Sequence, residues 1–215
     1  MPRSRSSAGV ALAVLGLAGC GLFHPAAPAS CPADRTVVLA SQSDVVAFQT
    51  CLTARGIALR TGATVDVAPL HVTTITGDLV IGPTVGVEAV SLSELRAVDG
   101  AIVVMGNGSL HGLFLPRLER AGRIVVEGNV SLASIAMPRL AEVTGGMTIS
   151  DNHDLEILDA PALVQVGGDL VLVNHPQLTI VELGALRSAA AVRFDALPKL
   201  AAEVLDGLRA RASPR

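Results

Sequence analysis

The stretch Asp151-Asn152-His153-Asp154 is the part of the sequence best equipped for chemistry. Its two carboxylates and one imidazole are ligands that a divalent metal ion accepts. The same residue types are also ordinary in turns, where Asp and Asn side chains hydrogen-bond to the nearby backbone. We favour the structural turn and predict no metal site and no cofactor. The metal-ligand candidates, should a site exist, are Asp151, His153 and Asp154.

The rest of the sequence lacks the common catalytic motifs: there is no Gly-x-Ser-x-Gly, no Walker loop and no His-Glu-x-x-His. The formal net charge is −3, and no basic run or stripe occurs. A nucleic-acid partner needs a clustered basic face, so we predict no nucleic-acid binding. We expect a non-catalytic protein. The alternative is a metal-dependent or carbohydrate-active enzyme built on a β-solenoid.

The turn around Asp151 belongs to a repeat of 22–23 residues. Three columns of apolar residues keep the same phase through the chain, which predicts a mainly β fold, a parallel β-solenoid with one coil per repeat. The columns are Leu79, Ile102, Ile124, Met147, Leu170 and Val192; Leu110, Leu132, Leu155, Leu178 and Leu200; and Leu95, Leu118, Leu140, Leu163 and Leu186.

Three asparagines, Asn107, Asn129 and Asn152, fall at one position of successive coils. Stacked amides can hydrogen-bond the turn backbones above and below them, so we predict a structural Asn ladder. In the next coil His175 takes this position and Asn174 precedes it, which we interpret as a one-residue slip of the frame. We also expect prolines to keep the second side of each coil from forming a regular strand or helix. These prolines are Pro116, Pro138 and Pro161.

One residue of each short strand should point outward, and most of these residues are aliphatic. This row offers no acids or bases for a catalytic groove, and an exposed apolar row is typical of a contact surface. The alternative is that β-branched residues simply favour strands, or that a loop covers them. The candidate interaction surface is Val80, Val103, Val125 and Val171, and the row also holds Thr148 and Arg193.

Short capping helices are expected at both ends of the solenoid, over residues 41–55 and 198–211. Ser41 or Ser43 is a suitable N-cap for the first helix. Apolar residues three to four positions apart should form one buried face on each helix. These faces are Val45, Phe48 and Leu52 in the first helix and Leu200, Val204 and Leu208 in the second.

Residues 1–19 have the pattern of an export signal, with Arg3 and Arg5 before a short apolar segment. The sequence that follows, Leu17-Ala18-Gly19-Cys20, resembles the lipobox of bacterial lipoproteins. The resemblance implies cleavage before Cys20, lipidation of Cys20 and a membrane partner held through the lipid anchor. Because Gly21 rather than Asp follows, it also implies the outer membrane of the cell envelope. The alternative is an ordinary signal peptide with a chance cysteine.

Cys31 and Cys51 are the two cysteines that remain after Cys20. An exported protein matures in an oxidising compartment, where an even number of cysteines favours pairing. We predict a Cys31–Cys51 disulfide that stabilises the fold by about 3 kcal/mol through the closed loop. Two free thiols are the alternative.

The repeated pattern of Gly-x-apolar-x-apolar, Asn-x-x-Leu and x-Pro-x-Leu, as in Gly100–Val104 with Asn107 and Leu110, resembles leucine-rich repeats and specifically the receptor L domain. The resemblance covers roughly residues 37–200. It implies a right-handed solenoid at a cell surface and transfers no catalytic residue. We therefore expect a lipid-anchored envelope protein whose solenoid binds an envelope or extracellular protein or glycan, or serves as a structural module.

We predict the following domain organisation. Residues 1–19 form the signal peptide and residues 20–30 a tether. Residues 31–211 form a single solenoid domain, followed by a tail at 212–215. Within the domain the N-terminal cap spans 31–56, the repeats about 57–198 and the C-terminal cap helix 198–211.

Overall fold

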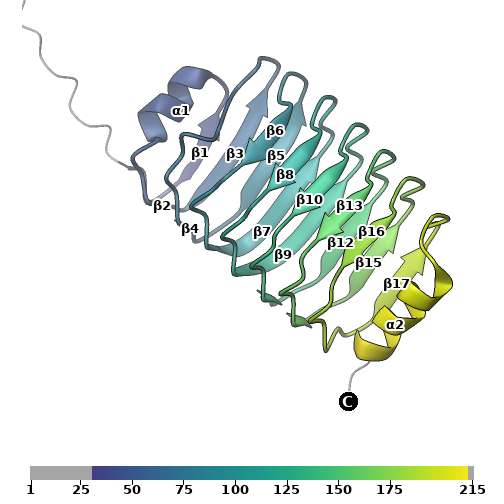
Figure 1. The fold of residues 1–215 in the computed structure, drawn as a ribbon. Coiled ribbons are helices and arrows are strands. Elements are labelled where there is room, and N and C mark those ends of the chain that lie inside the picture. Colours follow the sequence, from purple (N-terminus) through teal and green to yellow (C-terminus); the bar gives the residue numbers. More distant parts are fainter. Residues whose placement is uncertain (1–30, 213–215) are drawn as a thin grey trace, which may run out of the picture.

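A computed structural model describes residues 31–212 of the chain. These residues form a parallel β-solenoid of about seven coils with a spacing of about 23 residues (Figure 1), so the predicted fold class is confirmed. The predicted signal peptide, Cys20 and nearly all of the tail lie outside the described residues.

The larger of two sheets has twelve strands, and every pairing in it is parallel. Its main path runs in the order β1-β3-β5-β7-β9-β12-β15-β17, and the four two-residue strands β2, β4, β11 and β14 pair beside this path. Each coil adds one strand, because each repeat contributes one short β-branched and aliphatic segment at the same phase. The main strands are β1 (Thr36–Leu39), β3 (Gly56–Thr61), β5 (Leu79–Thr84), β7 (Ala97–Met105), β9 (Arg120–Glu127), β12 (Met147–Ser150), β15 (Leu170–Val173) and β17 (Val192–Asp195), and the short ones are β2 (Thr53–Ala54), β4 (Thr74–Ile75), β11 (Glu142–Val143) and β14 (Gln165–Val166).

The second side of the coils forms a parallel sheet of five three-residue strands, in the order β16-β13-β10-β8-β6. Our expectation that the prolines prevent regular strands here is wrong. Each of these strands ends before the proline position of its coil, so the missing N–H of proline removes no ladder hydrogen bond. The strands are β6 (Ala89–Ser91), β8 (Gly112–Phe114), β10 (Ser134–Ala136), β13 (Ile157–Asp159) and β16 (Ile180–Glu182).

The core lies between the two sheets and is built from the apolar columns of the repeat. Ile102, Ile124 and Leu132, for example, have no exposed surface. Adjacent coils approach so closely at one corner that a Cβ on Gly122 would lie 2.3 Å from the carbonyl oxygen of Asp99. A glycine in each repeat therefore allows the coils to stack at the spacing of a β-ladder.

The N-terminal helix α1 (Gln42–Phe48) is shorter than the predicted span of 41–55. Ser41 is its N-cap and forms a capping box with Asp44. The chain turns after Phe48 because Thr53–Ala54 pairs with Thr74–Ile75 as strands β2 and β4. Leu52, predicted on the buried helix face, is 59% exposed.

The C-terminal helix α2 (Ala202–Ala212) begins four residues later than expected. Leu200 precedes it in a turn closed by its N–H on the Leu197 carbonyl, 3.2 Å away, which repeats the turn of the previous coil. Leu208 is buried as predicted, whereas Val204 is 42% exposed. The helix packs against the last coil through its buried residues Leu208 and Ala212. Its final turn is joined to the preceding coil by a hydrogen bond from the Ala189 N–H to the Ala212 carbonyl, 3.0 Å long.

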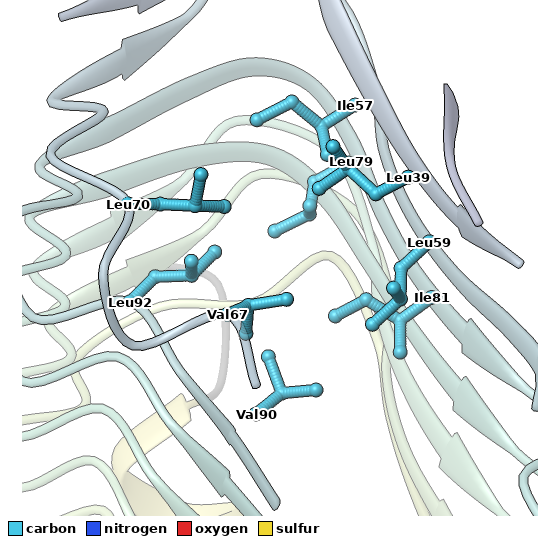
Figure 2. Close-up of a pocket in the computed structure, with 9 residues that line it drawn as sticks. All are labelled: Leu39, Ile57, Leu59, Val67, Leu70, Leu79, Ile81, Val90 and Leu92. Carbon is cyan, nitrogen blue, oxygen red and sulfur yellow. The ribbon is translucent and has the colours of Figure 1, made fainter. Parts of the chain in front are cut away.

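The N-terminal coils are packed less regularly than the rest. Residues 62–73 cross the second side of their coil without a strand, although Val67 and Leu70 still point inward. Figure 2 shows these side chains and Leu92 facing the residues of β3 and β5 across a small apolar cavity. Leu39, Ile57, Leu59, Leu79, Ile81 and Val90 complete its lining.

Candidate functional site

The three stacked asparagines are buried and joined by hydrogen bonds. The Asn107 Nδ2 donates to the Asn129 Oδ1 at 2.8 Å, and the Asn129 Nδ2 donates to the Asn152 Oδ1 at 3.0 Å. Backbone N–H groups of Asn107 and Asn129 donate to the same oxygens. Each Nδ2 also donates to a strand carbonyl one coil back, which satisfies a backbone acceptor inside the protein. These carbonyls belong to Ile81, Val104 and Val126.

Two residues that differ in type complete the ladder. Thr84, one coil before Asn107, donates from Oγ1 to the Asn107 Oδ1 at 2.7 Å. His175 fills the next position after Asn152 and has no exposed surface. The interpretation of a one-residue slip is wrong, because Ser150 pairs with Val173 in an unbroken register and His175 therefore stacks directly on Asn152.

Both ring nitrogens of His175 lie against backbone carbonyls, whereas each asparagine also bonds to a neighbouring ladder side chain. Its Nδ1 lies 3.1 Å from the Asn152 carbonyl oxygen and its Nε2 lies 3.0 Å from the Ile149 carbonyl oxygen. A neutral imidazole has one N–H, so only one of these carbonyls receives a hydrogen bond in that form. Burial lowers the pKa of His175, against the opposing effects of the two carbonyls and of the Asp151 carboxylate.

From Asn107 onward, the residue before the ladder position of each coil adopts a left-handed backbone. Gly106 and Gly128 have φ of 66° and 63°, and Asp151, Asn174 and Ala196 have φ of 56°, 62° and 51°. Glycine adopts this conformation freely and Asn and Asp tolerate it, whereas alanine is strained there. Asn174 therefore belongs to this turn column, and its Nδ2 donates to the Asp151 Oδ1 at 2.6 Å.

The candidate metal ligands do not converge. Asp151 belongs to the left-handed column, Asn152 points into the ladder, and His153 and Asp154 lie exposed on the outside of the turn. Between residues 31 and 212, no group of three His, Cys, Asp or Glu side chains is arranged to hold a metal ion. The chemical character of this tetrapeptide is explained by the turn that it builds.

The Cys31–Cys51 disulfide is confirmed, with the two Cα atoms 5.5 Å apart. It ties the start of the described chain to the residue that follows the turn after α1. Beside it, the Asp44 carboxylate accepts from the Ser41 hydroxyl at 2.8 Å. This hydrogen bond is the main reason that the pKa of Asp44 is lowered. The first coil is thus fixed by a covalent link and by a capped helix.

The outward residues of the large sheet form one continuous column. Val80 pairs with Val103, Val103 with Val125, Val125 with Thr148, and Thr148 with Val171. All five side chains are half-buried against their neighbours. The row ends at Arg193, which is exposed and pairs with Val171. Four steps of about 4.8 Å make it roughly 20 Å long.

Comparison with known proteins found no matching family model, curated protein or solved structure. In the described part of the chain, neither helix is long and apolar enough to cross a membrane.

Sequence reasoning missed two features of the ladder. Thr84 lies one period of 23 residues before Asn107, and the period alone was the available signal. The left-handed column was missed because Gly106, Gly128, Asp151 and Asn174 share a backbone conformation but differ in type. Its signal was the run of Gly, Gly, Asp and Asn at a fixed phase, since these residues favour positive φ.

Proposed function

We propose that the chain is a lipid-anchored protein of the bacterial cell envelope whose solenoid is a non-catalytic binding or structural module. The observation that carries the proposal is Leu17-Ala18-Gly19-Cys20 behind a basic and then apolar segment. Such a cysteine receives lipid after export, and more than one acyl chain is needed for stable anchoring. Gly21 after the cysteine favours the outer membrane.

The disulfide is consistent with this proposal. Structural disulfides persist in oxidising compartments and are rare in the cytosol of most organisms. The pairing of Cys31 with Cys51 leaves Cys20 as the one remaining cysteine. A chain exported to the envelope would meet both requirements, an oxidising environment for Cys31–Cys51 and lipid for Cys20.

Labelled palmitate and fractionation test the anchor. The wild-type protein should incorporate the label and sediment with membranes, whereas Cys20→Ala should do neither. Leu22→Ala, two residues beyond the cysteine, is the matched control and should behave as wild type. An unlabelled wild-type protein whose size does not change when lipoprotein signal peptidase is inhibited would overturn the proposal.

We further propose that the solenoid is of the receptor L type and that the row of Val80, Val103, Val125 and Val171 contacts an envelope or extracellular protein or glycan. The repeated Gly-x-apolar-x-apolar and Asn-x-x-Leu pattern supports the first statement. A half-buried, mostly aliphatic column on a regular sheet supports the second, because burial of its remaining apolar surface would favour association.

A capture experiment with paired variants tests the contact surface. Val103→Glu/Val125→Glu places two adjacent carboxylates in the centre of the row and should reduce capture of an envelope partner at least about tenfold. Val130→Glu/Val164→Glu changes two exposed valines elsewhere and should leave capture unchanged. Equal capture by both double variants, with unchanged thermal unfolding, would rule out the row as the contact surface.

A further inference from the structure

The first coil, at the N-terminal end of the solenoid, exposes three large aliphatic side chains. One of them, Val38, is the outward residue of its strand and continues, through Ala58, the column of Val80. Val38, Val46 and Leu52 are 56%, 54% and 59% exposed. Val38 lies on β1, the edge strand of the large sheet, and Val46 lies on α1. We call these three residues the N-terminal apolar surface. Exposed aliphatic residues elsewhere in the described chain are spread over different coils.

A groove joins the parts of this surface. It has a volume of about 180 Å³ and opens between α1 and β1. Val38, Ala47 and Phe48 line this groove, so the strand and the helix border the same depression. Val46 and Leu52 lie on the same first coil, each next in sequence to a lining residue. The lining is apolar except for one carboxylate and consists of Pro32, Val37, Val38, Asp44, Ala47, Phe48 and Cys51.

The carboxylate in the groove is already engaged. Asp44 accepts from the Ser41 hydroxyl at 2.8 Å and from the backbone N–H groups of Ser41 and Ala40 at 2.9 and 3.0 Å. It therefore completes the helix cap. The only other charged residues from Cys31 to Leu52 are Asp34 and Arg35, which have opposite sign. The surface is apolar and carries little net charge.

The two ends of the solenoid differ in the number of charged residues on their capping helices. The terminal repeats of a soluble solenoid need a polar outer face. The C-terminal helix α2 has one, with four charged residues among its eleven. The N-terminal helix α1 has seven residues, and its single charge is the engaged carboxylate of Asp44. In Figure 1 the two helices lie at opposite ends of the coils. The charged residues of α2 are Glu203, Asp206, Arg209 and Arg211.

The position of Cys31, where the described chain begins, indicates which ligand the N-terminal apolar surface meets. The described chain starts at Cys31, and the disulfide to Cys51 holds that point beside Leu52. Cys20 lies eleven residues earlier. Even when fully extended, eleven residues span at most about 40 Å. A lipid on Cys20 would therefore keep the N-terminal apolar surface close to the bilayer at a high effective concentration.

We propose that the N-terminal apolar surface docks on the lipid bilayer that holds the anchor, so that the solenoid stands with its first coil on the membrane. The inference rests on the proposed lipidation of Cys20. Val38, Val46 and Leu52 enter the boundary between headgroups and acyl chains, and the charged end at α2 points away from it. With little net charge at the contact, docking does not need anionic lipid.

The absence of tryptophan from the chain permits a direct test. Val46→Trp puts a single indole on the docking surface, and Val130→Trp puts one at a site of almost equal exposure, 55% against 54%, on another coil. Each full-length variant is expressed, purified from membranes and reconstituted into phosphatidylcholine vesicles with or without brominated acyl chains. Bromolipid should quench the Val46→Trp emission about twofold or more and leave the Val130→Trp emission almost unchanged.

Each other outcome overturns the proposal in a recognisable way. Equal quenching of both indoles shows that the solenoid has no preferred face toward the lipid. Emission from Val46→Trp that shifts to the blue with protein concentration, without quenching, shows that a second copy covers the surface. Acylated protein with an unquenched indole overturns docking alone, whereas protein without acyl groups on Cys20 by mass spectrometry overturns the anchor as well. Leu52→Trp replaces Val46→Trp if that variant does not fold.

Discussion

The coils from Ala97 to Asp195 and the coils from Thr36 to Thr84 share one continuous sheet but are held together differently. We call them the ladder coils and the N-terminal coils. In the ladder coils, side-chain hydrogen bonds link the stacked residues Asn107, Asn129 and Asn152, and the second side of the coils carries the strands β8, β10, β13 and β16. In the N-terminal coils the ladder ends at Thr84, and residues 62–73 carry no strand.

In the N-terminal coils, contacts that occur only at this end of the chain take the place of the internal hydrogen-bond network. A disulfide ties Cys31 to Cys51, and the helix capped by Ser41 covers the first coil. A repeated polar network is available only where equivalent residues exist in adjacent coils, so the first coils need other means. The difference teaches that regular stacking stabilises the middle of a solenoid, while its end depends on unique contacts.

The largest expected effect comes from breaking the ladder at its centre. Asn129→Ala removes the acceptor of the Asn107 side chain and backbone and the donor to the Val104 carbonyl. Several buried polar groups lose their partners, which should lower the free energy of unfolding by about 3–5 kcal/mol. A urea titration followed by circular dichroism measures it. Val130→Ala, an exposed neighbour, should change stability by less than about 0.5 kcal/mol.

Breaking the disulfide should have the next largest effect and should act on the N-terminal coils. Cys31→Ser/Cys51→Ser opens a loop with a sequence separation of 20 residues and should cost about 3 kcal/mol. Hydrogen exchange should increase first in β1 and α1, while the amides of the ladder coils stay protected. Uniform loss of protection along the whole solenoid would contradict the distinction between the two regions.

The repeat explains why the ladder coils were predictable. Residues that keep one phase over many coils must stack, so the apolar columns predict the sheet, and the common spacing of Asn107, Asn129 and Asn152 places them at one position. His175 was placed correctly at this position, but the one-residue slip was wrong, because Asn174 beside it imitates a ladder asparagine. The left-handed turn position favours Asn for a different reason, its tolerance of positive φ.

The ends were less predictable because tertiary contacts decide them. Val45, Phe48 and Leu52 have helical spacing, but the pairing of β2 with β4 ends the helix at Phe48 and leaves Leu52 exposed. At the other end, Leu200 continues the leucine column of the repeat and belongs to the last turn, not to the helix. Local periodicity cannot distinguish a cap from a final repeat where both place a leucine at the same step.

Replacing His175 tests what the last residue of the ladder contributes to stability at different pH. The pKa of His175 is lowered by burial, so the unfolded chain binds the proton more tightly than the folded chain. The stability that the neutral imidazole contributes is therefore full above the unfolded pKa of about 6.5 and is lost as the pH falls below it. His175→Asn supplies two N–H donors without a titratable group.

This variant should be more stable than wild type by about 1 kcal/mol near pH 5 and should differ little from it near pH 8. Urea titrations at the two pH values measure the change. His111→Asn, an exposed histidine on the coil of Asn107, is the control and should keep the wild-type pH dependence. The same loss of pH dependence in both variants would show that His175 is not the responsible group.

The smallest expected effect is an increase in stability from a substitution at the last left-handed position of the turn column. Ala196 has φ of 51°, where Gly106 and Gly128 stand in earlier coils. Alanine in this conformation costs about 1–2 kcal/mol, and glycine costs about 0.5–1 kcal/mol in unfolded-chain entropy, so Ala196→Gly should stabilise the protein by about 0.5 kcal/mol. Ala190→Gly, an exposed site without positive φ in the same coil, should instead destabilise it by about 0.4–1 kcal/mol. Opposite signs in paired urea titrations would show that the turn conformation, and not the amide ladder, is the property shared by every coil from Gly106 to Ala196.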